Sequence, residues 1–156
     1  MQVLTQEERT TRDFAVTVFI VQQGRVALLY DELAGTLAAP SGHIRLEELP
    51  AQAAARVALA QTGMPVELIL PFAPVWASPF LARPEGLLLE AITLSHEHIS
   101  LVYFARPATG FRLRLSEELP FLRWFDAAAL EGIGLQPEIA GWASEAISRD
   151  LRQDRP

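Results

Sequence analysis

The chain has 156 residues, of which 50% are hydrophobic and 21% are charged, and its formal net charge at pH 7 is −6. This composition predicts one ordinary globular domain with a real core, covering residues 1–156, and argues against a disordered chain. An acidic chain without a basic stripe is a poor candidate for a nucleic-acid binder, so we expect no nucleic-acid partner. The sequence lacks cysteine and lysine, which excludes disulfides, thiolate metal sites, a P-loop and Schiff-base chemistry.

The sequence also lacks the features of a membrane or secreted protein. It contains no apolar run of about 18 residues, and three prolines interrupt its most apolar region, residues 69–82. Its first residues are polar and charged, unlike a secretory signal peptide. We therefore expect a cytoplasmic protein with no membrane partner.

Strand and helix patterns occur in a mixed order along the chain. Residues 1–12 form a polar lead-in with a weak helical pattern. β-branched and aromatic residues predict strands at 14–21, 25–30, 36–39, 66–70, 87–94, 99–105 and 122–125, with residues 95–98 as a connection. Helices are predicted at 51–62, 127–131 and 136–152; Pro50 is suited to the first turn of the first helix and Gly63 to its end. This order favours an α+β fold with helices packed on a mixed sheet.

Four residues recur at a fixed spacing between residues 40 and 64. Gly42 is followed after five residues by Glu48 and after seven more by Arg56, and the stretch closes at Gly63 and Met64. This frame resembles the Nudix box, G-x5-E-x7-R-E-U-x-E-E-x-G-U, in which U is a bulky aliphatic residue. The surrounding strands and the C-terminal helix extend the resemblance over roughly residues 13–151. The resemblance implies the Nudix α/β/α sandwich, with the box helix and a C-terminal helix packed on a mixed sheet.

The resemblance also implies a chemistry. In that family, glutamates of the box helix hold Mg²⁺ or Mn²⁺, which activates a water to attack a nucleoside diphosphate linked to another group. Mg²⁺ requires oxygen ligands, and residues at i, i+3 and i+4 share one face of a helix. In this sequence these positions hold Val57, Ala60 and Gln61, and none of them offers a carboxylate. Upstream, Arg45 stands where many members carry another acidic residue.

We therefore expect a degenerate box whose frame remains while its metal face is lost. By the resemblance, Glu48 and Arg56 pair and hold the loop against the helix. Such a protein would bind a nucleoside-diphosphate-type small molecule, with metal-dependent hydrolysis weak, altered or lost. Two alternatives remain open: an active hydrolase that recruits other glutamates, and a structural or interaction subunit, including a homodimer.

Candidate residues follow from these alternatives. An active hydrolase would use Glu48 with Glu47, Glu90 or Glu97 as metal ligands or base; the candidates are Glu48 and Glu97 for catalysis, and Glu47 and Glu48 for Mg²⁺ or Mn²⁺. Whether or not the protein is active, the candidates for substrate contact are Arg45, Trp76, Phe80 and Glu90. The frame comprises Gly42, Glu48, Arg56 and Gly63. If no activity remains, no metal cofactor is needed.

A pair of histidines lies outside the box. His96 and His98 have the i, i+2 spacing that places both on one face of an extended segment, which suits a transition-metal pair. His43 is the third histidine of the chain, and the sequence does not fix its distance from the pair. A polar turn between two strands is the more ordinary interpretation.

Overall fold

The computed structural model describes residues 10–32, 35–71, 81–111 and 121–153. In chain order, these residues form β1 (Thr11–Gln22), β2 (Arg25–Asp31), β3 (Thr36–Ala38), β4 (Ser41–His43), α1 (Pro50–Thr62), β5 (Val66–Ile69), β6 (Gly86–Thr93), β7 (His96–Pro107), β8 (Leu122–Asp126), α2 (Ala127–Glu131) and α3 (Pro137–Gln153). Each predicted strand and helix overlaps one of these elements. Within the described residues, no helix is long and apolar enough to cross a membrane.

The strands form one mixed sheet. Strands β3, β2, β1, β7 and β5 pair in that order, while β4 pairs with β1, β6 with β7, and β8 with β2. The central pair, β1 and β7, is parallel from Thr11 opposite His96 to Ile20 opposite Ala105. The other pairings are antiparallel.

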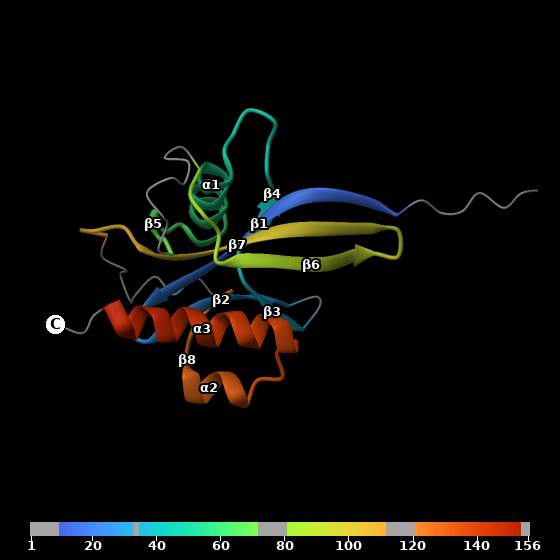
Figure 1. Ribbon diagram of the computed structural model, residues 1–156. Coiled ribbons are helices and arrows are strands. Elements are labelled where there is room, and N and C mark those ends of the chain that lie inside the picture. Colours follow the sequence, from blue (N-terminus) through green and yellow to red (C-terminus); the bar gives the residue numbers. More distant parts are fainter. Residues whose placement is uncertain (1–9, 33–34, 72–80, 112–120, 154–156) are drawn as a thin grey trace, which may run out of the picture.

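Helices cover both faces of this sheet, with α1 on one side and α3 on the other (Figure 1). Successive strand residues point to opposite faces, so β1 and β7 contribute to two separate cores. One core, on the α3 side, contains Phe19, Val21, Val102, Phe104 and Ile147. The other, on the α1 side, contains Val16, Val18, Ile20, Val57 and Tyr103. The expected α+β sandwich, with the box helix and the C-terminal helix on a mixed sheet, is confirmed.

Partly buried ion pairs join α3 to β7 and to the residue before β6. Arg106 Nε donates to Asp150 Oδ1 at 2.7 Å, and the backbone N–H of Gly24 donates to Asp150 Oδ2 at 3.0 Å. Arg149 donates to both carboxylate oxygens of Glu85, at 3.1 and 2.9 Å. These contacts fix the helix against one face of the sheet.

Three expectations about where strands lie were wrong. Thr11 and Arg12 begin β1 where a weak helix was expected, and His96 begins β7 where a connection was expected. Both differences have one cause, since Thr11 and His96 pair with each other across the sheet. The third difference is β4, which lies in a segment for which no strand was predicted. It forms because Gly42 pairs with Val16 of β1. Long-range pairing therefore extends these strands beyond what local pattern indicates.

The far ends of β1, β6 and β7 extend together beyond the helices (Figure 1). The residues at these ends are Thr11, Thr93 and His96, and β4 lies alongside β1 nearby, with His43 opposite Ala15. The start of the box is therefore adjacent to the end of the sheet that carries the histidine pair.

Candidate functional site

Helix α1 has defined ends that place the box residues. Its first residue is Pro50, whose missing N–H is not needed there. The N–H of Leu49 donates to Gln52 Oε1 at 2.8 Å. Gly63 ends the helix in the left-handed conformation, with φ of 71°, and its N–H donates to the Leu59 carbonyl oxygen at 2.9 Å.

Glu48 ties the loop before α1 to the helix. Arg56 Nε donates to the two Glu48 carboxylate oxygens at 3.0 and 3.2 Å, and Arg56 Nη2 donates to Glu48 Oε1 and to the carbonyl oxygen of His43. The N–H of Arg45 also donates to Glu48 Oε1, at 3.0 Å. The hydrogen bond from Arg56 is the main reason that the pKa of Glu48 falls to about 2, with burial partly opposing it. A carboxylate held in this way is a poor general base at neutral pH.

The metal-facing positions of α1 are occupied by other contacts. Val57 is 2% exposed, and its Cγ2 would lie 3.0 Å from any Cβ added at Gly42, so only glycine fits there without displacement. Gln61 Nε2 donates to the Ser41 carbonyl oxygen at 2.7 Å, while Gln61 Oε1 accepts from the Ser41 N–H at 3.1 Å. Ala60 is exposed and has no polar atom in its side chain. These residues do not fit a Mg²⁺ or Mn²⁺ site, because the positions supply no carboxylate and the amide is already engaged.

The candidate glutamates that the structure describes do not lie close enough together to share a metal ion. Arg12 Nε donates to Glu97 Oε2 at 2.6 Å. Glu90 lies opposite His98 in the register of β6 and β7, so Glu90 and its near neighbour Glu97 point to opposite faces of the sheet. Glu90 Oε2 accepts a 2.6 Å hydrogen bond from Ser100 Oγ. Within the described residues, Glu47, Glu48, Glu90 and Glu97 take part in no group of three His, Asp or Glu ligands close enough to share an ion.

The remaining candidates divide by position. Arg45 is exposed in the loop before α1. Trp76 and Phe80 lie outside the described residues.

A pocket of about 400 Å³ lies on the α3 side of the sheet. It is formed by β2, β3, β6 and the connection between α2 and α3, and Glu90 is one of its polar residues. Its other walls include Tyr30, Leu37, Leu88, Gln136 and Ile139. Sequence reasoning missed this pocket, since its walls come from four separate segments. Of the residues that line this pocket, Glu90 alone was predicted to contact substrate.

A second, more open hollow of about 490 Å³ adjoins the box. It includes Ser41 and Gln61, together with Tyr30 and Ala38, and these last two residues also line the first pocket. The hollow beside the box and the first pocket therefore share residues of β2 and β3.

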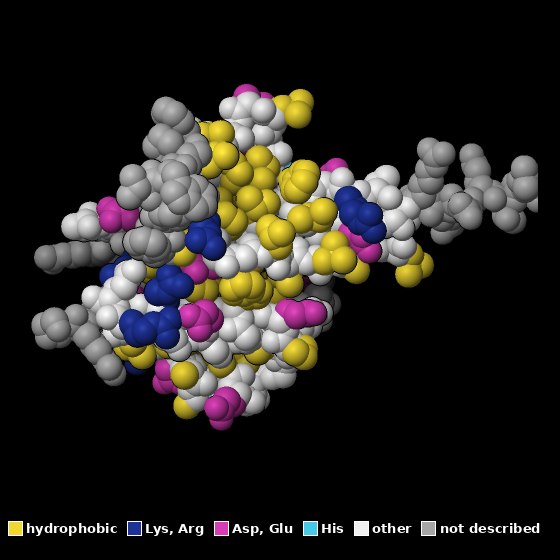
Figure 2. Space-filling model, viewed as in Figure 1, with side chains coloured by type: hydrophobic (Ala, Val, Ile, Leu, Met, Phe, Trp, Pro, Cys, Tyr) yellow, Lys and Arg dark blue, Asp and Glu magenta, His cyan; other side chains and the backbone are white. Residues whose placement is uncertain are grey.

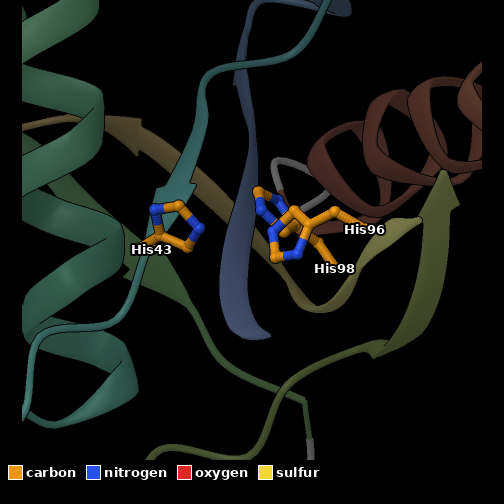
Figure 3. Close-up of side chains that lie close together, drawn as sticks. All are labelled: His43, His96 and His98. Carbon is orange, nitrogen blue, oxygen red and sulfur yellow. The ribbon is translucent and has the colours of Figure 1, made fainter. Parts of the chain in front are cut away.

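The three histidines gather at the free end of the sheet. Figure 3 shows the His43 ring, from β4, turned toward His96 and His98 of β7. The ring centroid of His98 lies 4.4 Å from that of His43 and 5.0 Å from that of His96. Burial lowers the pKa of His98, and the neighbouring histidines lower it further. The expectation of a polar turn at residues 95–98 did not place His43 there, because β1 separates the two segments in the sheet.

Comparisons with known proteins agree with this architecture. A family model described as NUDIX domain matches residues 10–149. The crystal structure of a NUDIX-family hydrolase from Clostridium perfringens is similar with a TM-score of 0.72 and 28% sequence identity, covering 88% of this chain and 97% of that one. The MutT protein from Methanosarcina mazei Go1 aligns with a TM-score of 0.61 and 16% identity, covering 94% and 98% of the two chains.

A third solved structure, the C. elegans Ap4A hydrolase, aligns with a TM-score of 0.55 and 14% identity, covering 92% of this chain and 97% of that chain. At identities of this size, the similarity shows the fold alone. A search of curated proteins found no match. Since the domain match spans most of the chain and the sheet, box helix and C-terminal helix agree with it, the protein belongs to the Nudix family.

Proposed function

We propose that this protein is a single-domain Nudix binding protein that holds a nucleoside-diphosphate-type small molecule and has weak or no metal-dependent hydrolysis through its box. The observation that carries the proposal is the composition of one face of α1. Val57 is buried and apolar there, Ala60 has no ligand atom, and the Gln61 amide is hydrogen-bonded to Ser41.

The expected loss of hydrolytic rate follows from what a bound metal ion contributes to the reaction. The Nudix family generally uses divalent metal ions and acts on nucleotide derivatives. A bound ion that activates water and neutralises phosphate charge supplies several kcal/mol of transition-state stabilisation, and each ~1.4 kcal/mol is about tenfold in rate. Without the ligands for that ion, hydrolysis falls by several powers of ten while binding of the ligand is retained.

The pocket beside Glu90 supports ligand binding. Its volume of about 400 Å³ lies within the roughly 300–1,000 Å³ typical of small-molecule sites. Tyr30 offers an aromatic face, and Glu90 and Gln136 offer hydrogen-bonding groups. That combination suits a nucleobase and its sugar. The activity of the Nudix family on nucleotide derivatives is consistent with a nucleotide derivative as the ligand class.

The test combines binding with turnover. Nucleoside diphosphate sugars, dinucleoside polyphosphates and nucleoside triphosphates are titrated calorimetrically, and each is then assayed for hydrolysis with Mg²⁺ and Mn²⁺. We expect binding of at least one class without metal-dependent turnover. Gln136→Trp, which fills the pocket, should abolish that binding, whereas Gln153→Trp at the exposed end of α3 should leave it intact.

Two results would contradict the proposal. Efficient metal-dependent turnover that Glu48→Gln abolishes would support the alternative of an active hydrolase that uses Glu48 with other glutamates. Equal binding by both tryptophan variants would remove the pocket as the site.

A second candidate is a homodimer or interaction subunit, and an exposed apolar area favours it. Figure 2 shows hydrophobic side chains gathered over β1, β7 and β6 and extending toward α1. Phe14 and Leu89 both lie opposite Ile99 in the sheet, so their side chains share one face. They are 63% and 60% exposed. Light scattering should then show a dimer that Leu89→Glu dissociates and Leu46→Glu, in the exposed loop before α1, does not; a monomer at all concentrations would refute it.

A further inference from the structure

We propose that His43, His96 and His98, with Asp13, form a binding site for a divalent transition-metal ion of the zinc class, separate from the metal-facing positions of α1. The chain contains three histidines in all, and the fold brings every one of them to this place. Their ligand nitrogens all lie within 4.8 Å of one another. The three rings come from β4 and β7, on either side of β1 (Figure 3).

Asp13 supplies the fourth donor. Its Oδ2 lies 3.5 Å from His43 Nε2 and 3.6 Å from His96 Nε2. Zinc binds nitrogen and oxygen ligands at about 2.0–2.1 Å, so neighbouring donors of a tetrahedral site are roughly 3.3–3.4 Å apart. The separations between Asp13 and the rings of His43 and His96 are close to this spacing, and the His98 ligand nitrogen lies within 4.8 Å of those of the other two rings.

A neighbouring hydroxyl orients His96 for this role. Thr11 Oγ1 lies 2.8 Å from His96 Nδ1 and donates to the Ser95 carbonyl oxygen at 3.3 Å. When the hydroxyl gives its single proton to Ser95, it accepts from Nδ1–H of His96, and metal binding at Nε2 requires this tautomer. In that tautomer the lone pair of Nε2 lies on the side of Asp13. Metal-binding histidines commonly donate their other ring N–H to a fixed acceptor in this way.

His98 provides an independent indication. Its Nε2 is buried and has no hydrogen-bond partner among the described residues. Buried polar atoms are rarely left without a partner, and such an exception calls for an explanation. A metal ion held between the three rings gives Nε2 a partner without any change in the strands.

The donor set selects the class of ion. Imidazole nitrogens suit zinc, copper, nickel and iron, whereas Mg²⁺ requires oxygen ligands and retains its waters. Four protein donors close the coordination sphere, which is typical of a structural zinc site. The ion would join β4, β1 and β7 next to Gly42 and so fix the strand from which the box begins. None of its four residues lines the pocket beside Glu90, and zinc binding can be measured without any hydrolysis.

The test uses tag-free protein stripped with a chelator, since a histidine tag would add competing ligands. Zinc is titrated calorimetrically in the presence of excess Mg²⁺, and Co²⁺ is followed by its visible absorption. We expect one ion per chain, an increase in the melting temperature, and the intense absorption of tetrahedral Co²⁺. His96→Ala and His98→Ala should each weaken zinc binding by at least about 10–100-fold, the range reported for loss of even an outer partner.

Two further variants test whether zinc affinity depends on the geometry of the site or only on nearby negative charge. Thr11→Val removes only the partner of His96 Nδ1 and should weaken binding by about tenfold. Glu97→Gln removes a carboxylate between His96 and His98 in sequence but on the other face of β7, and should leave zinc affinity unchanged.

The proposal is overturned if zinc does not bind, if Mg²⁺ displaces it, or if the histidine variants bind as tightly as the wild type. If an alanine variant fails to fold, X-ray absorption of the zinc-loaded wild type decides, because three imidazoles should be visible around the ion. Fewer than three imidazoles would also overturn the site.

Discussion

Glu48 illustrates at the scale of one residue how a box position serves the fold. Its pKa is lowered to about 2, below the ordinary value of 4.5, chiefly by the hydrogen bond from Arg56. A carboxyl whose folded pKa is depressed contributes stability that is present above about pH 4.5 and is lost as the pH falls toward 2. We therefore expect Glu48→Gln to lower the free energy of unfolding at neutral pH and to flatten its pH dependence in this window.

Chemical denaturation at a series of pH values measures this effect. Glu47→Gln is the matched control, since Glu47 is the exposed neighbour of Glu48 in the same loop. A Glu48→Gln variant with the same acid profile as wild type would show that the ion pair contributes nothing to stability.

The composition of the α1 face leads to a second prediction at the residue scale. Ala60 and Gln61 are exposed, whereas Val57 is buried, so the double variant Ala60→Glu with Gln61→Glu should fold without a buried carboxylate. At position 61 the new carboxylate would face the Ser41 carbonyl oxygen, which now accepts a hydrogen bond, and a cation between the two oxygens would relieve their repulsion. We expect the double variant to gain Mg²⁺ binding by calorimetry.

Gln52→Glu is the control for added negative charge, because Gln52 lies at the start of α1 and its side-chain oxygen accepts from Leu49. Equal Mg²⁺ uptake by the control and the double variant would mean that charge alone, and not the geometry of these positions, attracts the ion.

Contacts between residues close in sequence could be predicted, whereas contacts between distant residues could not. Glu48 and Arg56 are eight residues apart, and their spacing within a known frame predicted that they pair. Arg12 and Glu97 are 85 residues apart, so nothing local indicated that Glu97 is held in an ion pair. The same limit applies to His43, whose approach to the other histidines depends on the pairing of β4 with β1.

At the scale of elements, the close packing of α3 on β6 requires a residue without a Cβ at position 86. A Cβ added at Gly86 would lie 2.5 Å from Cη2 of Trp142, so Gly86→Ala forces the indole to move. Overpacking of this kind costs about 1–3 kcal/mol. Gly141 is exposed inside α3 with nothing within 4 Å of its added Cβ, and Gly141→Ala should stabilise the protein by about 0.5–1 kcal/mol.

Thermal unfolding of the two alanine variants should therefore shift in opposite directions, and tryptophan fluorescence should change only for Gly86→Ala. Two shifts of the same sign would contradict the close contact between β6 and α3.

Most elements were predictable because their patterns are local. Alternating apolar residues marked the strands, and Pro50 and Gly63 marked the ends of α1. The exceptions were β4, which has three residues, and the outer ends of β1 and β7. Their residues include Ser41, Gly42 and His96, which have little intrinsic preference for strands, and they became strands through pairing with distant segments. The candidate metal site and the pocket both lie next to these exceptions.

At the scale of the whole molecule, charged contacts join α3 to the sheet. Because α3 contributes Ile139 to the pocket, these contacts also hold one wall of the pocket in place. Asp150 is 1% exposed and accepts from Arg106 and Gly24, while Arg106 is partly exposed. Removing one member of a buried pair costs about 3–5 kcal/mol, and a hydrogen bond to a charged group contributes about 1.5–3 kcal/mol. Because Arg106 reaches solvent, we expect Asp150→Asn to destabilise the protein by about 2–3 kcal/mol.

The same helix provides the control for this last prediction. Arg152 and Glu145 form an exposed pair at 2.8 Å, and such pairs contribute less than about 1 kcal/mol. Glu145→Gln should therefore leave the free energy of unfolding nearly unchanged in urea denaturation, whereas Asp150→Asn lowers it. Equal effects would show that burial of Asp150 does not determine its contribution, and that the position of α3 over the pocket depends on its apolar face.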